Sequence, residues 1–289
     1  MTELLRIAVP NKGRLKDPVT TLLRDAGLLF EKTERALSVR VWNAPIELLF
    51  VRTDDIAELL VDGVADLGIT GQDLLANFDA GFETLVELEM GKCALVAAVP
   101  KASEIKGPEG FEGIRVATSH QRVTASYFET HNIKVDLVPL KGSVEVAPKL
   151  GIADAIVDLV SSGSTLLVNS LRPVMTIMES QAVLVAPLER SPYDHEKAEA
   201  IHRVATMLQA VIAGRTKRYL LMNAPLEQRD EILELLPSLD SPTIIPLADG
   251  THVAVHTVID RDIAWELLPR LQQAGATGLL VVPIGQLIR

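Results

Sequence analysis

The sequence predicts an α/β protein with a two-lobed core and a separate C-terminal module. Short apolar runs of strand length alternate with helical patterns along about the first two thirds of the chain, as in parallel α/β sheets. Beyond Gly214, which ends a long helical pattern, the order changes to strand, helix, two strands, helix and strand. We therefore expect a domain boundary close to Gly214.

The first lobe is predicted from strands whose ends carry helix-start signals. Asp17 and Pro18 have the pattern of an N-cap followed by proline at the first helical position, and Gly27 is the expected stop. Thr53 is a second candidate cap, and Gly71 opens a third helix. The strands are expected at residues 5–10, 46–51 and 65–70, and the first two helices at 17–26 and 54–61.

An apolar strand at residues 93–99 is expected to carry the chain into a second lobe. The elements expected there are strands over 114–118, 135–140 and 155–160 and helices over 123–130 and 143–150. Pro148 falls inside the last of these helices, where proline removes a backbone donor. Residues 183–186 would return the chain to the first lobe and lead into a long helix over 194–213. The first lobe is thus assigned residues 1–92 and 183–214, and the second lobe residues 93–182.

Residues 215–289 have the β-α-β-β-α-β order of the ferredoxin-like plan. The strands are expected over 219–222, 243–247, 253–259 and 279–284, and the helices over 225–236 and 260–273. Domains of this shape often bind small regulators or pair through their sheets, but a fold alone assigns no function.

The strongest candidate for a site is the loop after the strand at 155–160. Residues 161–165 are Ser-Ser-Gly-Ser-Thr, and the amides of such a loop form an anion seat that Gly163 leaves open. Asp154 and Asp158, four apart, are expected on one face of the strand. Carboxylates beside a phosphate seat favour a phosphorylated sugar, with the acids on its hydroxyls or on Mg²⁺. A Ser-rich turn that merely caps the next helix is the structural alternative.

Basic residues follow two of the predicted strands in the first lobe. Lys12 and Arg14 come after the strand at 5–10, and Arg52 comes after the strand at 46–51. Open α/β sheets bind ligands at the carboxyl ends of their strands, so these cations are candidates for phosphate contacts. Solvated surface positions are the alternative for Lys12 and Arg14.

Composition and charge exclude several classes of protein. The 289 residues carry a formal net charge of −10, which argues against a general nucleic-acid surface. The apolar runs are far too short to span a bilayer, and the first residues lack a secretory signal. Cys93 is the only cysteine, which excludes an internal disulfide and a cysteine-based zinc site. A cytosolic protein without membrane or nucleic-acid partners is expected.

Five stretches resemble the ATP phosphoribosyltransferase family across essentially the whole chain. They are RIAVPNKGRL (6–15), ADLGITGQD (65–73), RVATSHQRVT (115–124), GSVEVAPKLGIADAIVDLVSSGSTL (142–166) and SPTIIPLAD (241–249). The C-terminal module makes the chain similar to the long, self-regulated form. The resemblance implies a core like that of type II periplasmic binding proteins, a homo-oligomer between dimer and hexamer, and feedback inhibition by L-histidine.

The resemblance also implies a reaction, the first step of histidine biosynthesis. N1 of the adenine of ATP attacks C1 of phosphoribosyl pyrophosphate in the presence of Mg²⁺, giving phosphoribosyl-ATP and pyrophosphate, and no covalent protein nucleophile is needed. The implied ligands of phosphoribosyl pyrophosphate are Glu145, Asp154, Asp158, Ser161, Ser162, Gly163, Ser164 and Thr165. The implied ligands of ATP are Lys12, Gly13, Arg14, Arg52, Thr70, Gly71 and Asp73. Catalysis is expected to depend most on Asp158, Asp154, Lys12 and Arg52, with Mg²⁺ on Asp154 and Asp158, partly through the substrate.

Two sets of positions bear on regulation or depart from the family pattern. The inhibitor pocket implied by the family maps onto Asn223, Ser241 and Thr243. An acid can occupy the position of Asn223, where it would pair with the amino group of histidine, so an amide is expected to weaken binding. The family often has Tyr-Pro where this chain has His120 and Gln121.

Two other functions compete with this one. A ligand-binding sensor built on a binding-protein-like core would have a cleft without acids next to a phosphate loop, and Asp158 before the Ser-rich loop argues against it. Prephenate dehydratase also joins a two-lobed domain to a small amino-acid-binding domain. That family carries a Thr-Arg-Phe motif, which does not occur in this sequence.

Overall fold

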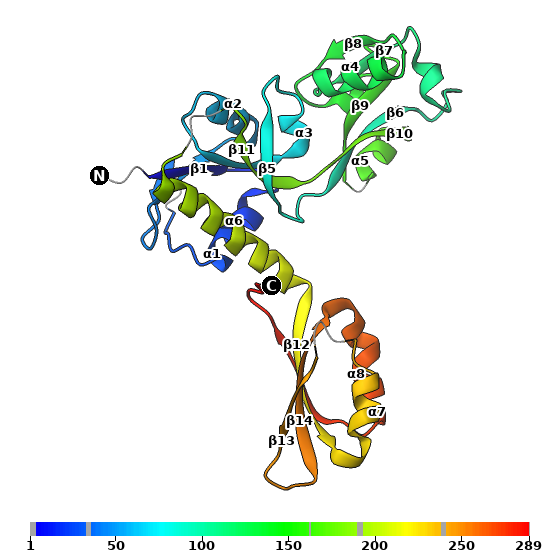
Figure 1. Ribbon diagram of the computed structural model, residues 1–289. Helices are drawn as coiled ribbons and strands as arrows, with labels where there is room; N and C mark the ends of the chain where they lie inside the picture. Colours follow the sequence, from blue (N-terminus) through cyan, green and yellow to red (C-terminus); the bar gives the residue numbers. More distant parts are fainter. Residues whose placement is uncertain (1–3, 33–35, 162, 190–192, 238–240, 289) are drawn as a thin grey trace. The chain divides into compact units, whose positions relative to one another are not determined.

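The computed structural model describes residues 4–32, 36–161, 163–189, 193–237 and 241–288 (Figure 1). The chain divides into two compact units. The first comprises residues 1–21 and 28–202, and the second comprises residues 22–27 and 203–289. Within the described ranges, no helix combines the length and the apolar character that crossing a membrane requires.

The first unit contains a six-stranded sheet that starts near the N-terminus. Its strand order is β2-β3-β1-β4-β11-β5, and β1 pairs in parallel with both β3 and β4. The elements of this part are β1 (Leu5–Pro10), α1 (Lys16–Asp25), β2 (Ser38–Arg40), β3 (Ile46–Val51), α2 (Ile56–Val61), β4 (Leu67–Gly71), α3 (Gln72–Leu75), β5 (Phe82–Glu87) and β11 (Ala182–Pro187). Ile56 and Leu60 of α2 pack into the core on one face of the sheet, because apolar side chains recur at helical spacing.

A five-stranded sheet of order β10-β6-β9-β7-β8 makes up the rest of this unit's framework. Its elements are β6 (Cys93–Pro100), β7 (Arg115–Thr118), α4 (Gln121–Thr130), β8 (Asp136–Pro139), β9 (Ala155–Val160), α5 (Ser164–Val168) and β10 (Leu171–Ser180). Its core includes Phe111 and Phe128, whose ring centroids lie 5.3 Å apart. We call the part built on the six-stranded sheet the first lobe, and the part built on the five-stranded sheet the second lobe.

Both sheets follow one plan. Three parallel strands are followed in the sheet by an antiparallel strand, which is the first strand that the chain forms after it crosses from the other lobe. β11 joins β4 in this way, and β6 joins β9. β6 and β10 pair antiparallel, so that Ser180 at the end of β10 lies opposite Cys93 at the start of β6. The chain crosses between the lobes at residues 88–92 and at Gln181. The two-lobed, binding-protein-like α/β core that the sequence predicted is confirmed.

The sequence did not predict three of the strands, β2, β5 and β10. β2 is three residues long and mostly exposed, and only one residue of β5 is fully buried, so neither has a clear apolar period. β10 contains Pro173 and two register irregularities. It lies at the edge of its sheet, the position in which a strand tolerates proline and bulges.

The helix predicted over residues 143–150 is wrong. This segment contains a single 3₁₀ turn over Val144–Val146, which ends before Pro148. Ser143 adopts a left-handed conformation (φ 50°) and makes no capping hydrogen bond. Proline does not interrupt a helix here, because the turn is already complete when the chain reaches it.

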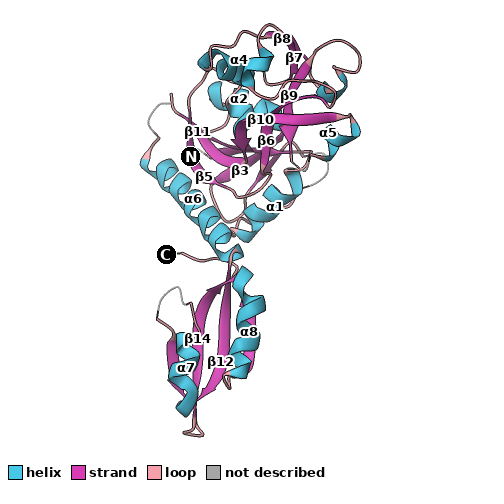
Figure 2. Cartoon of the chain, turned by 90° about the vertical axis from the view of Figure 1, so that its right-hand side faces the viewer, coloured by secondary structure: helices cyan, strands magenta, loops and turns pink. Residues whose placement is uncertain are grey.

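The C-terminal part of the second unit is a four-stranded antiparallel sheet with two helices on one face (Figures 1 and 2). Its order, β13-β14-β12-β15, confirms the predicted ferredoxin-like plan. The helix α6 (His195–Arg215) precedes it, and its elements are β12 (Lys217–Pro225), α7 (Arg229–Glu234), β13 (Thr243–Pro246), β14 (His252–Asp260), α8 (Ala264–Gln273) and β15 (Thr277–Pro283). Leu220 and Met222 of β12 pack against Leu267 and Leu271 of α8.

Leu271→Ala should destabilise the C-terminal unit by about 3 kcal/mol, because it opens a cavity at a fully buried position of α8. Trp265→Ala on the same helix is the control. Its side chain is 88% exposed, so the free energy of unfolding should change by less than about 0.5 kcal/mol. Urea unfolding followed by circular dichroism measures both values, and equal losses would contradict this packing.

Candidate active site

A small pocket forms where β9 ends and α5 begins. Its lining residues are Glu145, Asp158, Leu159, Val160, Ser161, Gly163, Ser164, Thr165 and Leu166. Gly163 has φ +75°, a left-handed conformation that favours glycine and turns the chain into α5. The structure therefore brings together the predicted loop residues, Asp158 and Glu145. Ser162, predicted for the same loop, lies outside the described residues.

Two carboxylates meet in this pocket from different elements. Asp158 is half-buried on β9, and its Oδ1 accepts a hydrogen bond from the N–H of Leu159 at 2.8 Å. Burial raises the pKa of Asp158 above its ordinary value, and the nearby Glu145 adds to the rise. The Leu159 N–H and His120 act in the opposite direction without cancelling it. A carboxyl group with a raised pKa in a pocket is typical of a functional position.

Asp154 does not share this pocket, contrary to the prediction. It precedes the first residue of β9, whereas Asp158 lies near the end of that strand, so the two are about four strand residues, or roughly 13 Å, apart along the chain. Asp154 instead forms an exposed ion pair with Arg115, with Nη2 at 3.0 Å from Oδ1. The prediction used the alternation of side chains correctly but ignored the length of the strand.

The cations predicted for the first lobe lie at one edge of its sheet. β1 is flanked in parallel by β3 and β4, with Pro10 opposite Val51, so the residues after all three strands share that edge. Lys12, Gly13 and Arg52 are exposed there. Thr70 is fully buried, and its hydroxyl donates to the carbonyl of Thr53 at 3.2 Å, which ties the strand end to the next turn.

Two residues at this edge carry no signal in the sequence. Nη2 of Arg14 donates to Sγ of Cys93 at 3.1 Å, and Cys93 is buried at the start of β6. Oδ1 of Asn11 is buried and has no hydrogen-bond partner within the described ranges. A lone cysteine or asparagine next to a strand has no distinctive pattern, so only the fold could place them beside Lys12 and Arg14.

Asp73 is 5% exposed and points away from solvent into a hydrogen-bonded cluster. Its Oδ1 accepts from Oγ of Ser180 at 2.6 Å, and its Oδ2 lies 3.3 Å from Nε2 of His120. Burial acts to raise the pKa of Asp73, but the hydrogen bonds from His120 and Ser180 outweigh it and hold the pKa below its ordinary value. Asp73 is therefore an ionised, fully bonded carboxylate.

The predicted regulatory residues lie on the C-terminal sheet. Thr243 is opposite His256, which in turn is opposite Leu221. Opposed residues share a face and side chains alternate, so Asn223 lies on this face too, which α7 and α8 leave uncovered. Asn223 and Thr243 are on strands separated by β14. Ser241 is exposed just before β13.

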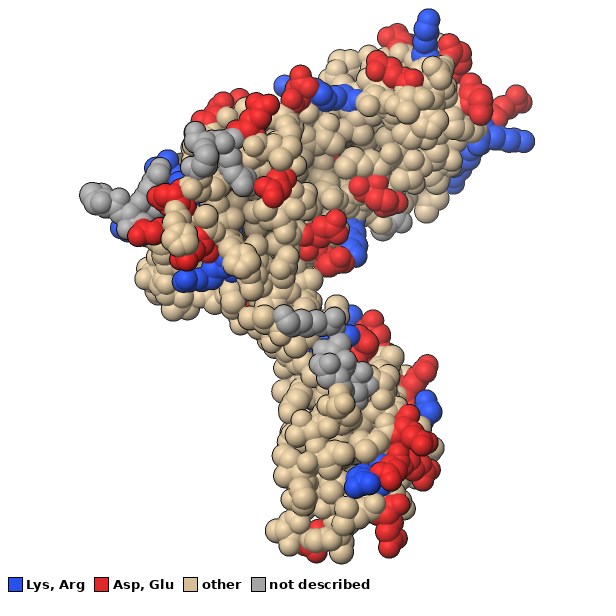
Figure 3. Space-filling view, in the orientation of Figure 1, with Lys and Arg blue, Asp and Glu red and all other residues tan. Residues whose placement is uncertain are grey.

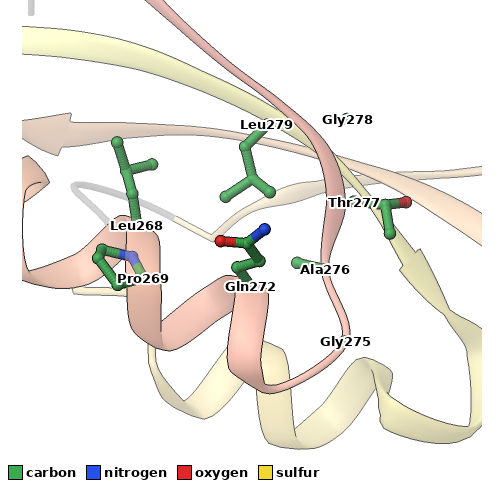
Figure 4. A pocket seen from close by; sticks show the side chains of 8 residues that line it. All are labelled: Leu268, Pro269, Gln272, Gly275, Ala276, Thr277, Gly278 and Leu279. Carbon is green, nitrogen blue, oxygen red and sulfur yellow. The ribbon is translucent and has the colours of Figure 1, made fainter.

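A second pocket lies at the end of α8 and the start of β15 (Figure 4). It is lined by Leu268, Pro269, Gln272, Gly275, Ala276, Thr277, Gly278 and Leu279. The amide of Gln272 points toward Leu279 across it (Figure 4). Thr277 is opposite Asn223 in the sheet, so this pocket adjoins one of the predicted regulatory residues.

Comparisons with known proteins identify the family. A family model described as ATP phosphoribosyltransferase matches residues 52–210, and one described as the HisG C-terminal domain matches residues 214–286. The ATP phosphoribosyltransferase of Parabacteroides distasonis is 41% identical over 285 residues, which are 99% of this chain and 100% of that protein. That of Methanococcoides burtonii is 41% identical over 290 residues, with the same two coverages. The ATP phosphoribosyl transferase (HisG:HisZ) complex from Thermotoga maritima contains a chain with a TM-score of 0.61 and 30% identity, covering 71% of this chain and 99% of that one.

The chain belongs to the ATP phosphoribosyltransferase family. An ATP phosphoribosyltransferase is a pentosyltransferase, and this one acts in the first step of histidine biosynthesis. The match of its last residues to the C-terminal family domain makes it the long form. The sensor and prephenate dehydratase hypotheses are thereby set aside.

Asp158→Asn should stabilise this ATP phosphoribosyltransferase near neutral pH in the absence of substrates and metal. Because folding raises the pKa of Asp158, the folded protein holds that proton more tightly than the unfolded chain. Below the unfolded pKa of about 4, Asp158 is protonated in both states and costs no stability. As the pH rises, the unfolded chain loses this proton first, and the folded protein becomes less stable relative to it. The melting temperature of the variant should therefore exceed that of the wild type at pH 7, and the difference should vanish toward pH 4.

Melting curves in EDTA between pH 4 and pH 8 measure this difference. Asp154→Asn is the matched control, because its pKa is lowered by Arg115 and its removal cannot stabilise the protein at pH 7. A gain for Asp158→Asn that does not depend on pH would contradict the electrostatic explanation.

Proposed function

We propose that the two lobes divide the substrates between them, with phosphoribosyl pyrophosphate in the second lobe and ATP at the strand edge of the first. The observation that carries this assignment is the pocket that gathers Glu145, Asp158, Ser161 and residues 163–165. Hydroxyls and amides suit a phosphate, and carboxylates suit the hydroxyls of a ribose. The described lining of this pocket includes no His or Lys that could activate its hydroxyl groups as nucleophiles. Direct attack of N1 of ATP on C1 of the ribose therefore fits its chemistry.

Within this pocket, Ser161, Ser164 and Thr165 would hold the 5′-phosphate, and Gly163 would let it approach the backbone. Asp158 and Glu145 would accept hydrogen bonds from the ribose hydroxyls. Ionised Asp158 is unfavourable in the empty pocket because of burial and Glu145. Hydroxyl donors from the sugar would relieve that cost, which favours a substrate over water.

At the edge of the first lobe, Lys12, Arg14 and Arg52 would contact the ATP phosphates and the departing pyrophosphate. All three are exposed, so their charges remain available to a ligand. The hydrogen bond from Arg14 to Cys93 fixes one of these guanidinium groups in place. Neutralising the charge that develops on the leaving group lowers the barrier, as does the alignment of two bound reactants.

The protein would bind Mg²⁺ mainly through its substrates. Among the residues that the structure describes, no three His, Cys, Asp or Glu side chains are placed to hold a metal ion. Glu145 and Asp158 nevertheless line one pocket, and Mg²⁺ is commonly held by one or two carboxylates together with substrate oxygens. When bound, it would supply positive charge to the pyrophosphate group. Asp154 would take no part, because Arg115 occupies it at the far end of the strand.

The uncovered face of the C-terminal sheet would serve assembly and regulation. It exposes apolar side chains, with Tyr219, Ile245, Leu280 and Val282 between 37% and 60% exposed. Figure 3 shows charged side chains gathered on the helix side of this unit and few on the sheet side. Such a face is suited to pairing with further copies of this chain in the cytosol. Asn223 and Thr243 on the same face would contact L-histidine.

Pyrophosphate release tests the proposed reaction. Release should require ATP, phosphoribosyl pyrophosphate and Mg²⁺ together. Asp158→Asn should lower kcat/KM about a hundredfold or more, because a charge-assisted contact to the substrate becomes neutral. Asp154→Asn, on the same strand but outside the pocket, should change it less than about twofold. Equal losses from the two variants would contradict the assignment of the pocket.

L-histidine should inhibit the wild-type enzyme, and Asn223→Asp should strengthen the inhibition about tenfold. A carboxylate at this position would make a charge-assisted hydrogen bond to the amino group of the inhibitor, worth on the order of 1 kcal/mol more than the neutral bond. Inhibition curves for the wild type, Asn223→Asp and Asn223→Ala measure the effect. Identical curves for all three would remove Asn223 from the histidine site.

A further inference from the structure

Three buried polar side chains from separate elements of the first unit form one hydrogen-bonded cluster. Asp73 begins α3 in the first lobe, His120 lies between β7 and α4 in the second lobe, and Ser180 ends β10 where the chain crosses between them. None of the three is more than 5% exposed. We call this group the Asp73–His120–Ser180 cluster.

The hydrogen bonds of the cluster form a continuous chain. The hydroxyl of Ser180 donates to Oδ1 of Asp73 at 2.6 Å and accepts from the N–H of Asp73 at 3.1 Å. Nε2 of His120 lies 3.3 Å from Oδ2 of Asp73. With Nε2 as the donor, Nδ1 accepts from the hydroxyl of Ser119 at 3.0 Å. Both carboxylate oxygens and both ring nitrogens therefore have partners.

Each lobe holds its own member of the cluster rigidly. In the second lobe, the N–H of His120 donates to Oγ1 of Thr118 at 3.0 Å, and the hydroxyl of Thr124 donates to the carbonyl of His120 at 2.7 Å. Both threonines are fully buried. In the first lobe, the carboxylate of Asp73 folds back over Gly71, where an added Cβ would lie 2.4 Å from Oδ1. The contact between His120 and Asp73 thus joins two fixed points.

The cluster lies between the two proposed substrate sites. Asp73 follows the strand end that carries Thr70 and Gly71, at the ATP edge of the first lobe. His120 comes two residues after Thr118, which pairs with Val157, the residue before Asp158 on β9. It therefore lies at the strand end that carries the proposed phosphoribosyl pyrophosphate pocket. A change in the cluster would move these two sites relative to each other.

We infer that Asp73 and His120 are positioning residues that set the distance between the substrates on the two lobes. This inference rests on the proposed function, which assigns ATP to the first lobe and phosphoribosyl pyrophosphate to the second. Bond formation requires N1 and C1 to approach in line, and a misplacement of about 1 Å can cost on the order of a hundredfold in rate. The two side chains would act on the reaction indirectly, by holding the lobes in place, since their polar atoms are already bonded within the protein.

A direct role in binding ATP and a purely structural role make different predictions. Asp73 is 5% exposed and both of its carboxylate oxygens have partners within the protein, which disfavours a direct contact with ATP. Loss of a direct ligand would raise KM for ATP alone, whereas loss of a positioning contact lowers kcat while each substrate still binds its own lobe. A purely structural contact would change neither constant in the folded enzyme.

His120→Phe tests the inference, because it keeps a ring of similar size and removes the hydrogen bonds. We expect kcat to fall about tenfold, with KM for ATP and for phosphoribosyl pyrophosphate within about twofold of the wild type. His120→Gln should recover most of the rate, since its amide nitrogen can take the place of Nε2. The double variant Asp73→Asn/His120→Phe should be no slower than the slower single variant, because the two residues act as a unit.

Asp79→Asn is the matched control. Asp79 of the first lobe pairs with Arg122 of the second, so this ion pair also joins the lobes, but its side chains are 87% and 51% exposed. Exposed pairs contribute little, and kcat should change less than about twofold. Turnover is measured as pyrophosphate release, and binding of each substrate alone by calorimetry.

A lowered kcat with unchanged binding of both substrates, rescued by His120→Gln, is the expected result. A raised KM for one substrate at unchanged kcat, a His120→Gln enzyme as slow as His120→Phe, or additive losses in the double variant would overturn the inference. If His120→Phe does not fold, the comparison of Asp73→Asn with Asp79→Asn decides the same question. A wild-type enzyme that releases no pyrophosphate would overturn the proposed function itself, which is a separate outcome.

Discussion

The core depends on two antiparallel strands, β6 and β10, that carry the chain between its lobes. Their pairing places Cys93 opposite Ser180 at the crossing. Each of these residues binds a side chain from the carboxyl edge of the first sheet, since Cys93 accepts from Arg14 and Ser180 donates to Asp73. The crossing therefore does more than connect the lobes. It fixes the edge at which ATP is proposed to bind, through one partly buried contact at Arg14 and one buried contact at Asp73.

The two aspartates around β9 show how one strand separates function from stability. Asp154 has its charge satisfied by Arg115 in the empty protein. Asp158 is held where burial and Glu145 disfavour its ionised form. Such an arrangement costs stability unless a ligand supplies donors, which is typical of a site that binds a polar substrate. Asp158, with its raised pKa, and Gly163 thus line one pocket, the one proposed to bind phosphoribosyl pyrophosphate.

The C-terminal sheet has one face buried under helices and one uncovered face. Alternate residues of β12 point into the helix-covered core, as Leu220 and Met222 do, and the residues between them lie on the uncovered face. That face combines exposed apolar side chains with Asn223 and Thr243, so assembly and inhibitor binding would use the same surface. Because the two proposed uses share this face, a ligand bound there would couple to the state of assembly.

The sequence by itself determined most of the strands, the turn at Gly163 after β9 and the basic residues that follow β1 and β3, because apolar period, glycine and charge are local signals. The strand at residues 155–160 was correctly predicted for that reason, and the edge strand β10, with its proline and bulges, was not. The tertiary structure alone decided which side chains meet. His120 and Asp73 are 47 residues apart in the chain, and Ser180 and Asp73 are 107 apart. Their contact arises only when the crossing strands bring the two lobes together. Asp154 pairs with Arg115 for a different reason, because β7 and β9 are neighbours within the second lobe.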